Sequence, residues 1–431
     1  MFAASKEEAG LPRETCRSLD RASRGQFEAS VSDNRLQIKS FFYGKGDTYM
    51  HARIIWLIER HKIPGAALAA ALGTLFMTNQ AMAHPPAVDS HATVSVYAEG
   101  LNNPRGLEFG PDGMLYVAEG GVGGLNLPPT SPECQVVPPV GPYTGSNTGS
   151  RISRIDRYGN RTTVVDDLPS SQTSAALGSL VSGVADIAFV GKRLYAILAG
   201  AGCSHGVPGI PNSVIRIHHD GSYSVIADLG AYQRANPVQN SEEDDFEIDG
   251  TWYSMIAVRG DLYAVEPNHG EIVKVTTKGE ISRVIDVSAS QGHVVPTAIA
   301  YHGNFYVGNL GVFPQDAGSS NVWKVTPSGR IKLAVTGFNM VLGLAFDDHG
   351  QLYVLETSAF PAPAPGTGRV VRISRDGKKH DVIADGLFLP TGMTYGPDGN
   401  LYVSNVGFGP PPVGLGQVLK IDLNDLDRGD D

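Results

Sequence analysis

The sequence predicts an all-β protein, a six-bladed β-propeller of four-stranded blades. Three observations support this prediction. The chain of 431 residues contains 52 Gly and 28 Pro and is only 18% charged, which is too rich in turns for a helical bundle. A strand–turn–strand phrase occurs six times, and a strand-like segment precedes the first copy where the last copy lacks one.

The phrase is clearest in GPDGMLYVAEGG (residues 110–121) and GPDGNLYVSNVG (residues 396–407). Each copy follows a short apolar segment and a turn with Gly, which is the pattern of a β-hairpin. The Gly-Pro-Asp-Gly segment therefore predicts a turn and not a phosphate-binding loop. The six copies are centred on Tyr116, Tyr195, Tyr263, Tyr306, Tyr353 and Tyr402.

A third strand is expected after each copy, as in RISRIDRYG (residues 151–159) and QVLKIDL (residues 417–423). A fourth strand follows in the first five copies, as in TTVVDDL (residues 162–168), but the chain ends before the sixth copy can have one. TVSVYAEGL (residues 93–101) resembles the fourth strands. We therefore expect this N-terminal strand to complete the last blade and close the ring, which removes exposed strand edges.

The N-terminal region predicts export. Residues 1–49 lack a pattern, and we expect them to be untranslated or disordered. Residues 50–83 combine a basic start, the apolar run IPGAALAAALGTLFM and Ala81-Met82-Ala83, as in a signal peptide. The alternative is a retained membrane anchor, for which the run is short. A flexible N-terminus (84–92), the propeller (93–423) and a tail (424–431) would follow.

Export implies a periplasmic or secreted protein without a stable membrane span after cleavage. Removal of residues 1–83 leaves 23 Lys and Arg against 36 Asp and Glu, a net charge of −13. No basic surface for nucleic acid is expected, and we expect a monomer that binds a small molecule. Cys134 and Cys203 are the cysteines of the mature chain, and an oxidising compartment favours a disulfide between them.

Long loops gather on one face of the predicted propeller, and function is expected there. We call this the loop face and the opposite one the turn face. The loops are residues 120–149, 200–212, 310–320, 357–368 and 406–416.

A ring of polar residues is expected at the loop-face mouth of the channel, three positions after each repeated tyrosine. The carboxylates among them would repel one another unless a cation intervenes, and Arg105 is the internal candidate. The alternative is a solvated polar collar. The positions are Glu119, Leu198, Glu266, Asn309, Glu356 and Asn405.

Three histidines are placed on the same face, namely His205, His269 and His293. Beside Glu266 they could hold a divalent transition metal, or one could act as a general base. The acidic run at residues 242–249 could bind Ca²⁺ or could simply be a solvated loop. The candidate metal ligands are therefore Glu119, Glu266, Glu356, Asn309, Asn405, His205 and His293, and the candidate catalytic residues are Glu266, His269 and Arg105.

The phrases NNPRGLEFGPDGMLYVAEGG (residues 102–121) and VVPTAIAYHGNFYVGNLGVFP (residues 294–314) resemble the ScyD/ScyE family, named after cyanobacterial scytonemin gene clusters. The resemblance spans residues 93–423. It implies an exported propeller connected with small aromatic metabolites, and it supplies no catalytic set.

More distantly, the blades resemble the gluconolactonase/regucalcin lactonases and the NHL-type propellers. The positions that match the metal ligands of those lactonases hold no carboxylate, so their calcium site is not expected here. These positions are Arg105, Ala185, Ser254, Thr297, Leu342 and Thr391.

Three functions remain open at this stage. The protein could be an enzyme, a metal-assisted hydrolase or an oxidative enzyme, that acts on a small molecule at the channel mouth. It could be a binding or scaffold propeller whose polar ring is structural. It could also be a quinone-dependent dehydrogenase, although the sequence shows no clear cofactor cradle. Fold analogy alone does not choose among these functions.

Overall fold

The computed structural model describes residues 28–32, 35–39, 92–124, 134, 136, 138–241, 247–408 and 414–426. The chain divides into two compact units, Met1–Ala83 and His84–Asp431. In the first unit, β1 (Glu28–Ser32) and β2 (Arg35–Lys39) form an antiparallel hairpin. The predicted signal peptide (50–83), residues 84–91 and residues 427–431 lie outside the described residues, and these boundaries stay predictions.

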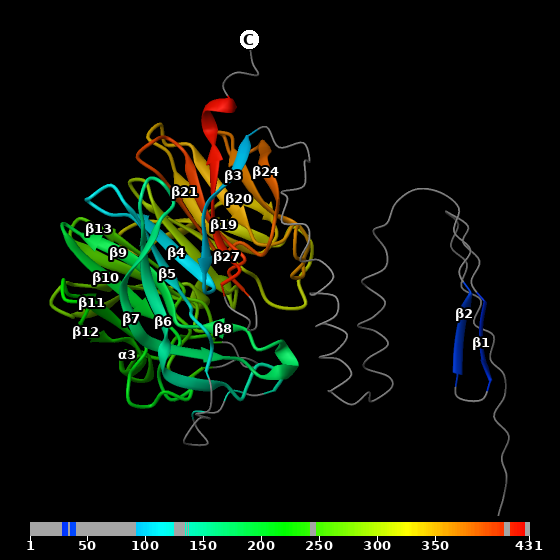
Figure 1. Ribbon diagram of the computed structural model, residues 1–431, viewed down its shortest axis with the longest axis horizontal. Helices are drawn as coiled ribbons and strands as arrows, with labels where there is room; N and C mark the ends of the chain where they lie inside the picture. The colour runs from blue at the N-terminus through cyan, green and yellow to red at the C-terminus, as the bar shows by residue number, and fades with distance from the viewer. Residues whose placement is uncertain are drawn as a thin grey trace, which may run out of the picture. The chain divides into compact units, whose positions relative to one another are not determined.

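The second unit is a six-bladed β-propeller, which confirms the predicted fold class (Figure 1). Each inner strand contacts the next inner strand around the ring. The inner strands are β4 (Pro104–Phe109), β9 (Val184–Val190), β13 (Ser254–Val258), β17 (Pro296–Tyr301), β21 (Val341–Phe346) and β25 (Gly392–Tyr395). The second strands are β5 (Leu115–Glu119), β10 (Arg193–Leu198), β14 (Asp261–Glu266), β18 (Phe305–Asn309), β22 (Leu352–Glu356) and β26 (Leu401–Asn405).

The third strands are β6 (Thr144–Ile155), β11 (Ser213–Ile217), β15 (Glu271–Val275), β19 (Ser320–Val325), β23 (Gly368–Ile373) and β27 (Gly416–Asp422). The outer strands of blades 1 to 5 are β7 (Arg161–Gln172), β12 (Tyr223–Asp228), β16 (Ile281–Asp286), β20 (Ile331–Phe338) and β24 (His380–Leu387).

The outer strand of blade 6 comes from the other end of the propeller sequence. β3 (Thr93–Leu101) pairs antiparallel with β27, with Ala98 opposite Val418. Figure 1 shows the cyan strand β3 beside the red strand β27. The predicted ring closure is therefore confirmed, and it gives blade 6 the fourth strand that the end of the chain does not supply.

The repeated Gly-Pro-Asp-Gly phrase forms a tight turn on the turn face. Gly113 has a left-handed φ of 76° and donates its N–H to the carbonyl of Gly110 at 2.9 Å. Asp112 accepts the hydroxyl of Tyr116 at 3.0 Å, which ties the turn to the following strand. The second copy repeats this bond between Asp398 and Tyr402 at 2.9 Å. These contacts explain why the Gly-Pro-Asp-Gly sequence and the following tyrosine occur together in two blades.

Blade 1 differs from the others. β6 and β7 have 12 residues each, and β6 begins at Thr144, so part of the loop predicted at 120–149 is strand. A two-residue strand, β8 (Val181–Ser182), adds a fifth member to this sheet. The described part of the chain also contains short helices that the sequence pattern did not predict, and they are η2 (Ala175–Leu177), α3 (Leu229–Ala235), α4 (Ser288–Gln291) and η3 (Leu423–Asp425).

The hydrophobic core lies between neighbouring blades. Trp252 is fully buried and packs with Tyr195 of blade 2 and Met255 of blade 3. At the closure, the rings of Phe109 in blade 1 and Tyr402 in blade 6 meet edge to face at 4.9 Å. Alternate residues of each strand thus bury apolar surface against the adjacent sheet, which holds the ring together.

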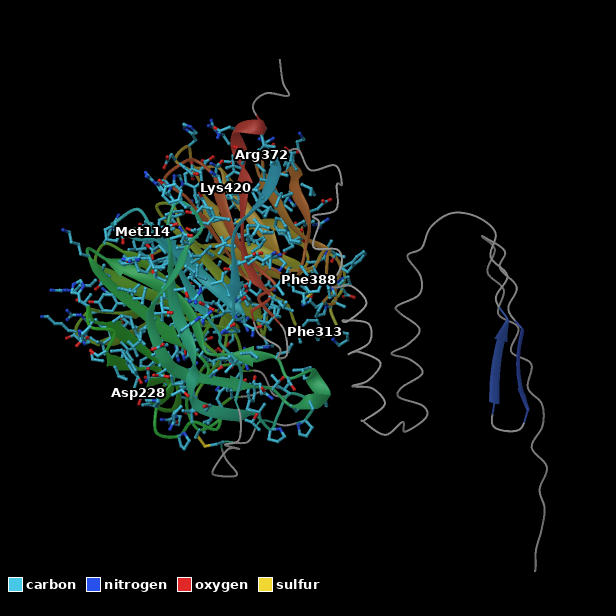
Figure 2. The ribbon with its side chains drawn as sticks, viewed as in Figure 1. Met114, Asp228, Phe313, Arg372, Phe388 and Lys420 are labelled. Carbon is cyan, nitrogen blue, oxygen red and sulfur yellow. A yellow bond between two sulfur atoms is a disulfide. The ribbon has the colours of Figure 1, made fainter. Side chains whose placement is uncertain are left out.

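The loops and turns occupy opposite sides of the propeller in Figure 2, where Phe313 and Phe388 lie on the loop side and Met114, from a tight turn, lies on the other. Phe313 is 50% exposed. Among the described residues, no helix is long and apolar enough to cross a membrane.

Candidate functional site

Three glutamates end second strands on the loop face, and all are buried. Glu119, Glu266 and Glu356 are each 0% exposed. Each accepts a hydrogen bond from a backbone N–H of the loop that enters its own blade. The donors are Asn102 for Glu119 (2.6 Å), Thr251 for Glu266 (2.6 Å) and Asn339 for Glu356 (2.5 Å). The carboxylates therefore fix the entry loops to the strand ends.

Two of these carboxylates are neutralised by arginines on the next strand. Arg151 Nε lies 2.8 Å from Glu119 Oε1, and Arg369 binds both oxygens of Glu356, with Nη2 at 3.2 Å from Oε1. Both arginines are the register partners of the glutamates in the β-ladder. The sequence predicts Arg105 as the counter-charge, but the structure gives this role to Arg151 and Arg369, because they lie directly opposite the glutamates.

The third carboxylate, Glu266, pairs with His269, as the proposed catalytic pair requires. His269 Nδ1 lies 3.2 Å from Glu266 Oε2. Burial would raise the pKa of Glu266, but His269 and the backbone donors outweigh it and lower this pKa. Burial would lower the pKa of His269, but Glu266 outweighs it and raises this pKa. The pairing with Glu266 therefore favours the charged form of the His269 imidazole.

The two asparagines of the predicted ring have the same fixing role. Asn309 Nδ2 donates to the carbonyl of Val294 at 2.8 Å, and Asn405 Oδ1 accepts the N–H of Phe388 at 2.8 Å. The polar groups of the ring are thus engaged within their own blades. The described residues contain no group of three or more His, Cys, Asp or Glu arranged to hold a metal. The structure does not bring the predicted ligands Glu119, Glu266, Glu356, Asn309, Asn405, His205 and His293 into one site.

His205 belongs to a separate buried cluster. It is 0% exposed, its ring meets Tyr143 edge to face at 4.5 Å, and its Nε2 lies 3.3 Å from Glu247. Burial lowers the pKa of His205 to about 4 and raises that of Glu247 to about 7. Glu247 also accepts the hydroxyl of Tyr143 at 2.8 Å. The structure thus places His205 against Glu247 and His269 against Glu266, in two separate pairs.

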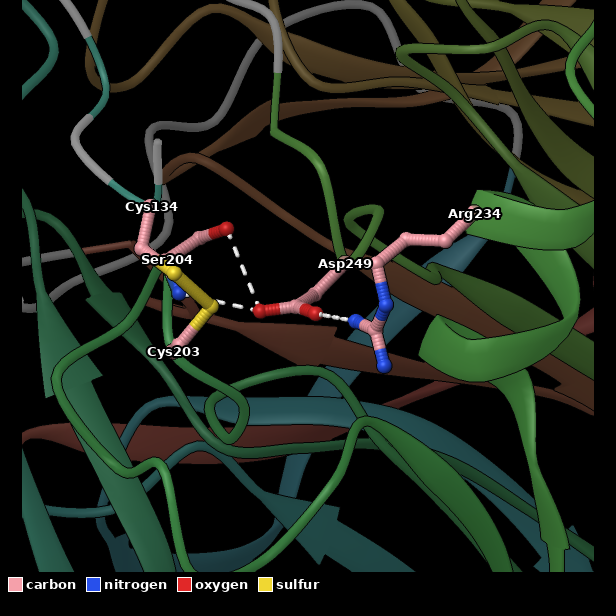
Figure 3. The surroundings of a disulfide bond; sticks show 5 residues. All are labelled: Cys134, Cys203, Ser204, Arg234 and Asp249. Carbon is pink, nitrogen blue, oxygen red and sulfur yellow. Dashed lines mark hydrogen bonds and ion pairs between the residues drawn. A yellow bond between two sulfur atoms is a disulfide. The ribbon is translucent and has the colours of Figure 1, made fainter. Parts of the chain in front are cut away.

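The acidic run that the sequence suggests as a Ca²⁺ site is described only at its end, because residues 242–246 lie outside the described residues. Asp249 accepts the backbone N–H of Ser204 at 3.0 Å and forms an ion pair with Arg234 (Figure 3). The adjacent Cys203 forms the predicted disulfide with Cys134, with a Cα–Cα distance of 5.4 Å. The disulfide joins the loops of blades 1 and 2, and the hydrogen bond between Ser204 and Asp249 joins the loop of blade 2 to the segment that enters blade 3.

A cavity of about 310 Å³ lies beside this network. Its lining combines apolar residues with Arg234 and His269, so the Glu266–His269 pair borders an open space. The other lining residues are Gln233, Pro237, Val238, Ser241 and Ile248.

A larger cavity, of about 570 Å³, fills the central channel between the inner strands. Two carboxyl groups that the sequence reasoning missed line it. Glu108 of β4 accepts the N–H of Phe189 at 3.1 Å, and Asp186 of β9 accepts the N–H of Met255 at 2.8 Å. A Cβ at Gly106 would lie 1.7 Å from Asp186 Oδ1, so this glycine makes room for the carboxyl group.

Both channel carboxyls bind protons more tightly than usual. Burial raises the pKa of Glu108 to about 8, and the charge of Asp186 adds to the rise. Burial raises the pKa of Asp186 to about 7, against two backbone N–H donors. Both groups therefore titrate near neutral pH, and the charge of Asp186 acts on Glu108.

Aligning the inner strands residue by residue would have found these two groups. Glu108 stands where other blades have Ala188, Ala257, Ala300, Ala345 and Thr394, and Asp186 stands where they have Gly106, Met255, Ala298, Gly343 and Gly392. The sequence signal for these two residues is a carboxyl group at an inner-strand position where the other blades have small or apolar residues.

At the loop-face end, Tyr253 and Thr391 line the channel, and the Tyr253 hydroxyl donates to the carbonyl of Thr391 at 2.9 Å. Burial raises the pKa of Tyr253 to about 12, although Arg105 opposes the rise. Arg105 thus lies at this end of the channel.

Comparison with protein-family models finds no match, and no curated protein matches the sequence. Solved structures are similar to the chain at low identity. They include a Thermus thermophilus protein described as a putative oxidoreductase (glucose dehydrogenase), with 18% identity over 77% of this chain and 100% of that chain and a TM-score of 0.49.

A gluconolactonase from Xanthomonas campestris has 10% identity over 77% of this chain and 89% of that chain, with a TM-score of 0.46. The PQQ-bound aldose sugar dehydrogenase of Streptomyces coelicolor has 14% identity over 78% of this chain and 99% of that chain, with a TM-score of 0.43. At these identities the similarities say nothing about the catalytic residues of this chain.

Proposed function

We propose that the protein is an exported propeller enzyme that binds a small molecule in its central channel and hydrolyses it by general acid–base catalysis. The observation that supports this proposal is the pair Glu108 and Asp186, two carboxyl groups with pKa values near neutral that line a cavity of about 570 Å³. A cavity of this size accommodates a small organic molecule.

The chemistry follows from the raised pKa values of the two carboxyl groups. The pKa values of about 8 for Glu108 and about 7 for Asp186 allow one carboxyl to be protonated while its neighbour is ionised. The protonated group can donate a proton to a leaving oxygen, and the ionised group can take a proton from water. Two carboxyls whose environments separate their pKa values are the usual basis of such an acid–base pair.

Export and the ScyD/ScyE resemblance belong to the same proposal. The disulfide between Cys134 and Cys203 is a bond typical of oxidising compartments, as expected after cleavage of residues 50–83. The resemblance suggests that the ligand is a small aromatic metabolite. The proposed hydrolysis is assigned to Glu108 and Asp186, because these are the carboxyl groups among the residues that line the cavity.

A non-catalytic binding propeller is the second candidate, and one observation favours it. Glu108 and Asp186 each accept a backbone N–H from the inner strand of the next blade. These bonds alone could account for both residues, because they satisfy donors at the edges of inner strands. In that case the channel would hold a ligand without changing it.

Hydrolysis of a panel of p-nitrophenyl esters and glycosides and of aromatic lactones tests the choice. We expect Glu108→Gln and Asp186→Asn to lower kcat by about 100-fold or more, the typical contribution of a general acid or base. Glu99→Gln, which changes an exposed carboxylate on β3, is the matched control and should leave kcat unchanged. Turnover that persists in the Glu108→Gln/Asp186→Asn double variant would exclude the carboxyl mechanism. Ligand binding without turnover in the wild type would favour the binding propeller.

A further inference from the structure

Arg105 is a buried cation that has no carboxylate partner in the described part of the chain. It is the second residue of β4, at the loop-face end of the channel, and is only 6% exposed. Its Nη2 donates to the carbonyl of Val181, and its guanidinium carbon lies 4.2 Å from the centre of the Phe408 ring. Burial lowers the pKa of Arg105, and the ionisable groups that act on it include the hydroxyls of Tyr253 and Tyr143.

Other arginines of this propeller have the carboxylate partner that Arg105 lacks among the described residues. Arg151, Arg283 and Arg369 each lie against a fully buried glutamate on the neighbouring strand. These three are more exposed than Arg105, with 19% to 27% of each side chain open to solvent. Burying a cation without a counter-charge costs free energy, and a guanidinium keeps its proton in proteins. The fold therefore leaves a positive charge at Arg105 that an anion can offset.

The location of this charge connects it to the channel. Tyr253, which interacts with Arg105, lines the large cavity, and so does Gly106, the residue that follows Arg105. The guanidinium carbon of Arg105 lies over the ring of Phe408, which is a cation–π contact. A planar guanidinium fork matches the two oxygens of a carboxylate.

We propose that the ligand of the channel is an organic carboxylate, held at its charged end by Arg105 and by the hydroxyl of Tyr253, which exchanges its bond to the carbonyl of Thr391 for one to the carboxylate. The body of the ligand then lies along the inner strands, where Ile256, Ile299 and Leu344 supply apolar surface and Tyr301 supplies an aromatic ring. This inference rests on the proposed function, because it names the substrate class of the same channel.

Matched pairs of small molecules test the inference, measured by isothermal titration and by thermal unfolding of the purified protein at constant ionic strength. Benzoate is compared with benzamide and phenylacetate with phenylacetamide, because each pair differs in charge and hardly in shape. We expect the wild type to bind each acid at least tenfold more tightly than its amide and to melt at a higher temperature with the acid.

Three variants locate the effect. Arg105→Met should abolish the preference for the acid, and Arg105→Lys should keep only part of it, because lysine retains the charge and loses the fork. Tyr253→Phe removes one hydroxyl and keeps the ring, so it should fold as the wild type does and weaken the acid several-fold. This variant keeps the inference testable if Arg105→Met does not fold.

The outcomes separate this inference from the proposed function. The proposal that the ligand is a carboxylate would be refuted if the wild type bound acids and amides equally or bound neither acid. It would also be refuted if Arg105→Met and Tyr253→Phe both bound the acids as the wild type does. Ala257→Leu narrows the channel at a partly exposed lining residue. If acids and amides bind equally and Ala257→Leu abolishes both, the channel remains the site and only the ligand class is wrong. If Ala257→Leu changes neither binding nor turnover, the channel is not the site, and both the carboxylate ligand and the proposed function are refuted.

Discussion

Glu108→Gln should make the propeller more stable at alkaline pH and leave it nearly unchanged at acid pH. Glutamine keeps an oxygen that can accept the N–H of Phe189, now at 3.1 Å from the carboxyl, and removes the ionisable group. In the wild type, the folded-state pKa of about 8 lies above the ordinary value of 4.5, so the folded protein binds this proton more tightly than the unfolded chain does. The stability that this group contributes is fully present below about pH 4 and is lost as the pH rises through 8.

The magnitude follows from the size of the pKa rise. Each pKa unit corresponds to about 1.36 kcal/mol, so a rise from 4.5 to about 8 sets an upper limit of about 5 kcal/mol on the cost of ionising Glu108. The channel opens to solvent and Glu108 is only half-buried, which reduces the cost. We therefore expect the stability of Glu108→Gln relative to the wild type to increase between pH 5 and pH 9 by up to about 4 kcal/mol, with most of the increase between pH 5 and pH 8.

Urea unfolding at a series of pH values between 5 and 9 measures this difference, with the disulfide kept intact. Glu99→Gln, at an exposed carboxylate of β3, serves as the control and should show no such trend. A stability difference between Glu108→Gln and the wild type that stays constant from pH 6 to 9 would refute the raised pKa and with it the acid–base role of the pair.

Three further predictions concern the loop face. Arg151→Met should destabilise the protein by about 3–5 kcal/mol in urea unfolding, because it leaves Glu119 buried and unpaired, and adding Glu119→Gln should recover part of the loss. Glu266→Gln should lower the pKa of His269, as measured by NMR titration. It should also reduce the free energy of unfolding by about 1–3 kcal/mol, equally with and without chelator. A loss of stability seen only without chelator would instead support a metal bound by the polar ring. Reducing the Cys134–Cys203 disulfide, whose residues are 69 positions apart, should cost about 4 kcal/mol by the loop-entropy model, and an unchanged urea midpoint in dithiothreitol would contradict that estimate.

The fold could be predicted from the sequence because each blade repeats the same pattern of strands and turns. A repeated tyrosine bound to a turn aspartate, as in Tyr116 and Asp112, marks the same hairpin in separate blades. The N-terminal strand was predictable for the same reason, because residues 93–101 supply the element that the last copy lacks. The lengths of β6 and β7 were not predictable, because they depend on blade 1 contacts that no other copy shares in the described part of the chain.

The same repetition explains why the predicted polar ring is structural. Glu119, Glu266 and Glu356 recur at one position because each of these blades attaches its entry loop to the end of its second strand. The pairing of a carboxylate with the arginine opposite it, as in Glu119 and Arg151, depends on the register of the third strand, and a repeat pattern alone does not contain that register.

The residues best placed for chemistry break the repeat instead. Glu108 and Asp186 replace small or apolar residues of the other inner strands, and Arg105 replaces Ala, Ser, Thr or Leu at its position. A position that holds the same kind of residue in every blade serves the architecture that all blades share. A charged residue that occurs in one blade only, and on a strand that lines the channel, serves no such common need and costs free energy where it is buried. Within a symmetric scaffold, function is therefore most visible as the loss of symmetry among its inner strands.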